Sequence, residues 1–263
     1  MQFATVTNLT VHYRVEGASS TNPLVFINSL GTDLRIWDAV VPYFAADYTV
    51  IRYDKPGHGL SDTPVGAYNI HHHAEMLLAL LDMLSVSSAV FIGISMGGQI
   101  AQNIAVHHPD RVRALVLCDT TAKLGTSEGW NQRIAGVREK GMTGMAKTIL
   151  DRWFAPSYAQ KHPTDYAGYH NMLVRMPDDG YISACEAIRD ADMRDQVSNI
   201  QVPALVICGA EDAATPPDVV QSLADALPRS QFELIEGAGH LPCIEQPSVM
   251  ALLIKNFLKD NNL

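Results

Sequence analysis

Ser95 lies at the centre of the segment Gly-Ile-Ser-Met-Gly, residues 93–97, and the two flanks of this segment differ in character. Residues 89–92 form an apolar run of strand length, whereas residues 100–105 are typical of a helix. A sharp turn from a strand into a helix exposes the serine hydroxyl, and glycines on both sides let the strand and the helix approach each other. The pattern predicts a nucleophile elbow, with a plain glycine-rich connection as the alternative.

A serine hydroxyl is a weak nucleophile at neutral pH, so it needs a histidine base that is oriented by a carboxylate. In proteins built on such an elbow, the acid and then the histidine follow the serine along the chain. Among the downstream histidines, only His240 follows a late predicted strand, in a loop with glycines before it and a proline after it. Asp212 is the predicted acid, because it follows a buried strand that ends at Cys208, and Asp119 at the end of another strand is the alternative.

The oxyanion that forms during acyl transfer needs N–H donors that are already in place, each worth about 2.7–4 kcal/mol. The backbone N–H of Met96, immediately after the nucleophile, is predicted to be one of them. The backbone N–H of Leu30, in the loop after the first buried strand, is predicted to be the other. Asn28 and Ser29 in the same loop are expected to order it or to touch a substrate.

Strands and helices alternate around these residues. Residues 4–15 predict an antiparallel hairpin at an edge of the sheet. Further strands are expected at 23–27, 48–53, 89–92, 112–117, 202–208 and 231–235, and helices at 37–44, 70–84, 100–105, 219–226 and 248–258. This alternation predicts an α/β fold with a mostly parallel, doubly wound sheet, in which catalytic groups gather at the carboxyl ends of the strands.

The alternation stops between residues 122 and 192. This stretch is helical in character and is broken at Gly141, Pro156, Pro163 and Pro177. We therefore expect a core domain of residues 1–121 and 193–263, with a helical cap of residues 122–192 inserted after the sixth strand and lying over the carboxyl ends of the strands.

The composition and net charge of the chain exclude several kinds of binding partner. The chain has 263 residues and a net charge of −9, which argues against nucleic acid or an anionic membrane surface as a partner. No apolar run approaches the ~18 residues of a membrane span, and the first residues lack the pattern of a signal peptide. Four dispersed cysteines form no CxxC pair, and the consecutive histidines 71–73 point in different directions on a helix. A cytoplasmic protein without disulfides, metal or cofactor is therefore expected.

Together these features resemble the α/β-hydrolase superfamily over nearly the whole chain. The resemblance includes Asn-Ser-Leu-Gly at 28–31, Asp-Lys-Pro-Gly-His-Gly-Leu-Ser-Asp at 54–62 and Gly-Ala-Gly-His at 237–240. Within the superfamily the chain is similar to the 3-oxoadipate enol-lactonases of bacterial aromatic catabolism, on residues 28–32, 93–98 and the cap segment 130–154. This resemblance implies a cofactor-independent serine hydrolase that opens the enol-lactone of 3-oxoadipate to 3-oxoadipate through an acyl-enzyme on Ser95.

An anionic lactone requires a cation or several hydrogen-bond donors in its pocket. The candidate cations of the cap are Arg133, Arg138, Lys147, Arg152 and Arg175. Arg133 and Arg138 are favoured for the substrate carboxylate, and Trp130 and Trp153 are predicted to be aromatic walls. Two alternatives stay open at this point: a general carboxylesterase or carbon–carbon bond hydrolase of the same fold, and a small-molecule receptor that retains the triad.

Overall fold

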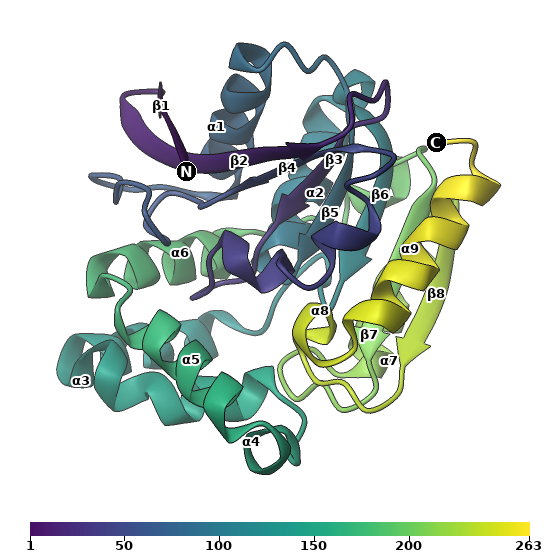
Figure 1. Cartoon of the computed structure of the whole chain (residues 1–263). Helices are drawn as coiled ribbons and strands as arrows, with labels where there is room; N and C mark the ends of the chain where they lie inside the picture. The colour runs from purple at the N-terminus through teal and green to yellow at the C-terminus, as the bar shows by residue number, and fades with distance from the viewer.

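The computed structural model describes all 263 residues, and an eight-stranded sheet forms its centre (Figure 1). The strands are β1 (Gln2–Val6), β2 (Leu9–Gly17), β3 (Leu24–Ile27), β4 (Thr49–Tyr53), β5 (Ala89–Ile94), β6 (Val112–Cys118), β7 (Ala204–Gly209) and β8 (Ser230–Ile235). They lie in the order β1-β2-β4-β3-β5-β6-β7-β8. β2 pairs antiparallel with β1 and β4, and every other pair is parallel, so the mostly parallel sheet and its antiparallel edge hairpin are confirmed.

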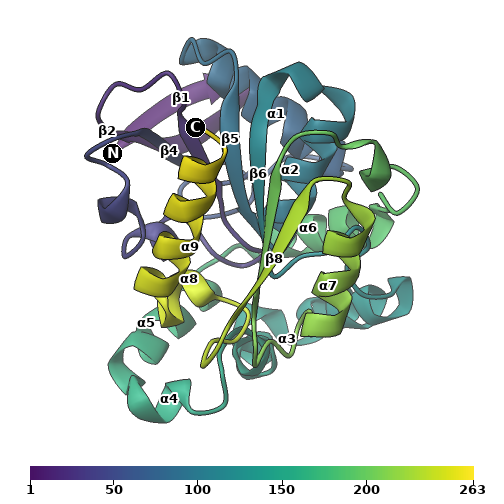
Figure 2. The same ribbon diagram turned by 90° about the vertical axis from the view of Figure 1, so that its right-hand side faces the viewer.

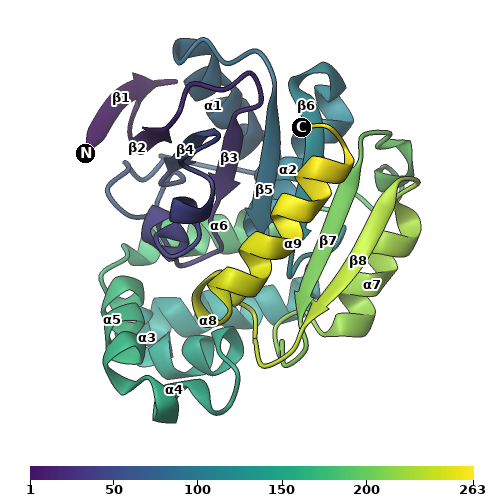
Figure 3. The same cartoon turned by 45° about the vertical axis from the view of Figure 1, so that its right-hand side comes forward.

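Helices cover both faces of the sheet. Helices α1 (Ile70–Met83), α2 (Met96–His107) and α7 (Pro217–Ala226) lie on one face, and α9 (Pro247–Asp260) crosses the other (Figures 2 and 3). Every residue of β3, β5 and β7 is buried, as expected of apolar strands covered on two sides. The sheet is therefore doubly wound, as the alternation of strands and helices predicted.

The predicted helix over residues 37–44 is wrong. Two short 3-10 turns occupy this region instead, η1 (Leu34–Trp37) and η2 (Val41–Tyr43). Pro42 has no N–H to donate and disfavours helical geometry at the residue before it, so a continuous α-helix cannot pass through this point. The remaining short turns are η3 (Pro109–Arg111), η4 (Val197–Asn199) and α8 (Pro242–Glu245).

Four helices lie between β6 and β7 in the chain and below the carboxyl ends of the strands (Figure 1). They are α3 (Ser127–Trp153), α4 (Tyr158–Lys161), α5 (Pro163–Val174) and α6 (Asp178–Asp190). The predicted breaks at Gly141, Pro163 and Pro177 are confirmed: α3 is kinked at Gly141, where φ is 65°, Pro163 opens α5, and Pro177 directly precedes α6. These helices form the roof of the site described below.

The seam between this roof and the sheet is tight. A Cβ atom at Gly180 of α6 would collide with the carbonyl oxygen of Gly57, in the loop after β4.

The four cysteines, two of them on β6 and β7, are buried and unpaired. None of the helices combines the length and the apolar character needed to cross a membrane.

Candidate active site

Ser95 occupies the sharp turn between β5 and α2 with φ 57° and ψ −118°, a conformation that residues with side chains rarely adopt. The turn is held on both sides of the residue. The Ser95 N–H donates to the Cys118 carbonyl at 2.9 Å, and the Thr120 hydroxyl donates to the Ser95 carbonyl at 2.7 Å. A Cβ at Gly97 would collide with the carbonyl oxygen of Ile27, so only glycine lets α2 start this close to β3. The strained turn presents the hydroxyl at the carboxyl end of the sheet.

His240 is oriented by Asp212. Its Nδ1 lies 2.8 Å from Asp212 Oδ2, and both residues are buried. The Asp212 carboxylate also accepts a hydrogen bond from the Thr215 hydroxyl at 2.6 Å and from the Ala214 N–H at 2.7 Å. Burial alone would raise the pKa of Asp212, but the nearby His240 and the hydrogen bonds from Thr215 hold this pKa below its usual value. An ionised Asp212 can thus fix the tautomer and orientation of the imidazole.

Asp119, the alternative acid, has a different partner. Its Oδ1 accepts the Gly209 N–H at 2.8 Å, and no hydrogen bond joins it to His240. Burial, followed by repulsion from Asp212, raises the pKa of Asp119 well above its usual range. The two carboxylates are close neighbours: an oxygen of each and the Cys208 sulfur all lie within 4.8 Å of one another. The hydrogen bonding favours Asp212 over Asp119 as the acid.

Two backbone N–H groups beside Ser95 are free to bind an oxyanion. The Leu30 N–H donates to no acceptor in the protein. Met96 is the first residue of α2, so its N–H has no acceptor within the helix. Ser95, Leu30 and His240 line one pocket, and no hydrogen bond joins Ser95 to His240. Such contacts often tighten only when the substrate binds.

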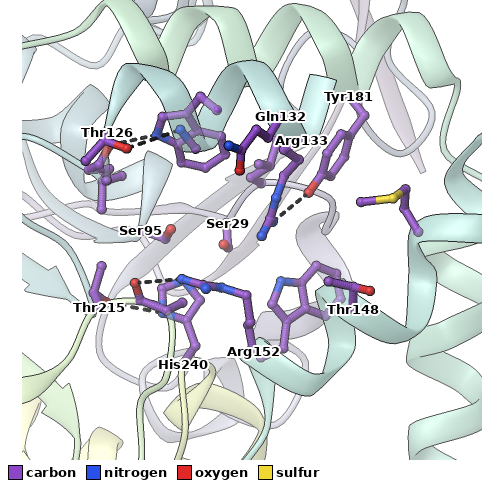
Figure 4. Close-up of a pocket in the computed structure, with 18 residues that line it drawn as sticks. Ser29, Ser95, Thr126, Gln132, Arg133, Thr148, Arg152, Tyr181, Thr215 and His240 are labelled. Carbon is purple, nitrogen blue, oxygen red and sulfur yellow. Dashed lines mark hydrogen bonds between the residues drawn. The ribbon is translucent and has the colours of Figure 1, made fainter. Parts of the chain in front are cut away.

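The pocket has a volume of about 520 Å³ and is roofed by α3 and α6 (Figure 4). Two guanidinium groups of α3 point into it, those of Arg133 and Arg152. Arg133 donates to the Tyr181 hydroxyl at 3.3 Å and lies 5.6 Å from the centre of the Trp130 ring, and Arg152 donates to the Ala214 carbonyl at 3.3 Å. Neither arginine forms an ion pair with a carboxylate, so both remain available to an anion.

The comparisons with known proteins agree with this geometry. The family described as the alpha/beta hydrolase fold matches residues 22–247. The chain belongs to the α/β-hydrolase family. It is 38% identical to 3-oxoadipate enol-lactonase 2 of Acinetobacter baylyi, over 98% of this chain and 96% of that protein, and 32% identical to enol-lactonase 1 of the same organism, over 95% and 93%. The crystal structure of the enol-lactonase from Burkholderia xenovorans LB400 superposes with a TM-score of 0.95 at 36% identity, covering 98% of this chain and all of the other.

Several residues predicted to contact the substrate do line the pocket of this α/β-hydrolase. They are Ser29, Trp130, Arg133 and Trp153. Arg138 does not: its guanidinium lies outside the pocket, exposed to solvent and 3.4 Å from Glu186, so the structure does not support its assignment to the substrate. Arg133 and Arg138 both precede the kink at Gly141, and their spacing of five residues puts them on different faces of α3. Sequence spacing alone could not tell which of the two faces inward.

Asn28 is likewise not in contact with the pocket of the α/β-hydrolase. It is fully buried, and its side-chain amide donates to the Thr32 carbonyl, so it orders the loop instead of touching a substrate. Tyr181 and Thr215 were not predicted, and Arg152 is one of the candidate cations of the cap but not one of the two favoured for the substrate. A local signal existed only for Thr215, because a hydroxyl three residues after Asp212 is well placed to bond its carboxylate. Tyr181 comes from α6, far along the chain from Ser95, and carries no such signal.

Proposed function

We propose that this α/β-hydrolase opens the enol-lactone of 3-oxoadipate to 3-oxoadipate, as a step in the breakdown of aromatic compounds. One observation carries the proposal: a single pocket holds the Ser95 hydroxyl and two guanidinium groups that have no carboxylate partner. The first group suits an ester carbonyl and the other two suit the free carboxylate of this lactone. The relatives named enol-lactonases, at 32–38% identity over nearly the whole chain, support the same substrate.

In the first half-reaction His240 takes the proton of the Ser95 hydroxyl, whose oxygen attacks the lactone carbonyl. The resulting oxyanion lies between the backbone N–H groups of Leu30 and Met96. Collapse of this intermediate breaks the bond between the carbonyl carbon and the ring oxygen. The ring oxygen departs as an enolate, more readily than an alkoxide would, and receives the proton from His240. The resulting enol, still part of the acyl group, then tautomerises to the ketone.

In the second half-reaction His240 removes a proton from water, which attacks the acyl-enzyme carbonyl. The same two N–H groups bind the second oxyanion, and Ser95 leaves with the proton that His240 returns. The product has one carboxylate more than the substrate. A pocket with two unpaired arginines, Arg133 and Arg152, can accommodate both the carboxylate that was present from the start and part of the new negative charge.

The decisive experiment follows the enol-lactone, generated in situ, by its ultraviolet absorbance with the native protein and with Ser95→Ala. We expect turnover by the native protein and its loss in the variant. A protein that cleaves simple esters but leaves the lactone intact would be a general carboxylesterase, which would overturn the assignment of substrate. Binding of the lactone without turnover by the native protein would indicate a receptor and would overturn the catalytic assignment altogether.

A further inference from the structure

Lys55 is a fully buried lysine behind the loop that carries Leu30. It follows β4, and its side chain has no ion pair with a carboxylate. The ammonium nitrogen donates to two consecutive backbone carbonyls, those of Asn28 at 2.9 Å and Ser29 at 3.0 Å. A buried lysine costs folding free energy and is seldom retained for packing alone. Both hydrogen bonds end on the carbonyls of the two residues before Leu30, whose N–H is the candidate oxyanion donor.

The geometry of a trans peptide connects these contacts to the site. The Ser29 carbonyl and the Leu30 N–H belong to one planar group and point in opposite directions. The carbonyl also accepts from the Thr32 hydroxyl at 2.9 Å, so it is anchored on the side away from the pocket. The N–H on the other side has no acceptor in the protein. Anchoring the carbonyl therefore aims the N–H into the pocket.

We propose that Lys55 is a positioning residue for the oxyanion hole, which aims the Leu30 N–H and, while it is an ammonium, strengthens this N–H as a donor. A cation bonded to the carbonyl of a peptide polarises the whole group, because hydrogen bonds in a chain reinforce one another at low dielectric. The inference rests on the proposed role of Leu30, and its test is arranged to be independent of the substrate assignment.

The charge of Lys55 depends on its neighbours. Burial lowers its pKa to about 7, against the opposing attraction of Asp54 and Asp33. Two buried histidines also face it: burial and the charge of Lys55 lower the pKa of His58 well below its usual range and that of His73 to about 3, so both are neutral at pH 7. Lys55 is thus an ammonium below about pH 7 and an amine above it. The oxyanion hole should weaken as the pH rises through this value.

The test uses p-nitrophenyl acetate, a neutral ester, and compares the native protein with Lys55→Gln, Lys55→Met and Thr32→Val. The glutamine amide keeps N–H donors without charge, methionine removes both, and valine at position 32 removes one neutral donor to the same carbonyl. Because loss of an entire oxyanion donor costs about 10²–10³-fold in kcat, we expect about a tenfold loss in Lys55→Gln and about a hundredfold loss in Lys55→Met, with KM nearly unchanged. Thr32→Val should lose less than Lys55→Gln.

The pH profile separates this role from simple support of the fold. Native kcat should fall as the pH rises through about 7, and both Lys55 variants should lack this fall while Thr32→Val keeps it. An identical alkaline fall in Lys55→Gln would overturn the role of the charge. If neither variant folds, the ¹³Cε resonance of Lys55 in the native protein should titrate near pH 7 together with kcat, and a lysine that titrates near its ordinary value would contradict the proposal. Failure of lactone turnover, with this ester profile intact, would overturn the substrate but leave Lys55 in its role.

Discussion

The floor and the roof of the pocket are built differently. On the floor lie Ser95 and His240, with Asp212 behind His240, and the three residues are 7%, 3% and 4% exposed. Hydrogen bonds with backbone or hydroxyl groups hold Ser95 and Asp212 in place. On the roof, Arg133 and Arg152 reach inward from α3 and each has one hydrogen bond of 3.3 Å. The floor thus derives its geometry from the backbone at the ends of β5, β7 and β8, whereas the roof derives its chemistry from long side chains.

This difference separates the reaction from the choice of substrate. A group that the sheet holds at a fixed position acts on whatever carbonyl arrives, so a change there should lower kcat for every ester. A guanidinium on the roof recognises only substrates that carry a negative charge, so a change there should alter KM for those substrates alone. Five substitutions test the distinction, in order of decreasing effect.

Asp212→Asn should have the largest effect. The amide cannot hold His240 in the tautomer that accepts the Ser95 proton, and we expect kcat to fall about 10⁴-fold for the lactone and for a neutral ester alike. Steady-state kinetics on both substrates measure it, with circular dichroism to confirm that the variant folds. A loss confined to one substrate would show that Asp212 acts on specificity, which would contradict a floor common to all substrates.

Arg133→Ala and Arg152→Ala should each raise KM for the anionic lactone. Loss of a charge-assisted hydrogen bond costs about 1.5–3 kcal/mol, and this corresponds to a rise in KM of roughly 10- to 150-fold. KM for a neutral ester should change little. Arg138→Ala is the matched control, because this arginine belongs to the same helix but lies outside the pocket. Equal rises in KM for the lactone and for the neutral ester would show that these arginines do not recognise the substrate carboxylate.

Gly180→Ala tests the seam between floor and roof. Alanine has a higher helix propensity than glycine and by itself should stabilise α6. Its Cβ, however, would collide with the carbonyl oxygen of Gly57, and relief of this collision must move the roof away from the sheet. We expect about 1–3 kcal/mol of lost stability, with a larger rise in KM for the lactone than for a neutral ester. Thermal unfolding and kinetics measure the two effects. A variant as stable as the native protein would mean that the seam is looser than the structure shows.

Asp119→Asn should have the smallest effect on catalysis. Burial and the nearby Asp212 raise the pKa of the native carboxyl, and asparagine keeps an acceptor for the Gly209 N–H, so kcat should change by about threefold or less. Stability should respond to pH. Because the folded pKa of Asp119 is raised, the folded state binds the proton more tightly, and native stability falls as the pH rises above the unfolded pKa of about 4.

Asparagine lacks this loss, so the free energy of unfolding of Asp119→Asn, relative to native, should increase with pH. Urea unfolding at a series of pH values measures the difference. A gap between the two proteins that stays constant with pH would mean that Asp119 is ionised in the folded state. In that case a loss of kcat comparable to that of Asp212→Asn would make it a second acid.

Much of the floor could be predicted because its signals are local. The segment around Ser95 combines a buried strand, two glycines and a helix within about a dozen residues, and the positions of Asp212 and His240 follow from the strands that precede them. The predicted helix over 37–44 does not form, because Pro42 interrupts it. Asn28 lies in the loop after β3, but the direction of its side chain depends on Thr32, which no pattern indicates.

The sequence alone predicts most of the strands and helices, the elbow at Ser95 and the stretch that breaks the alternation, because each depends on residues close together in the chain. The packing of distant segments selects which cap arginine faces the pocket, brings Arg152 beside Arg133 and places Lys55 behind the loop of Leu30. These contacts join residues far apart along the chain. Their geometry depends on a kink in α3 and on the packing of loops from different strands, which local periodicity does not encode.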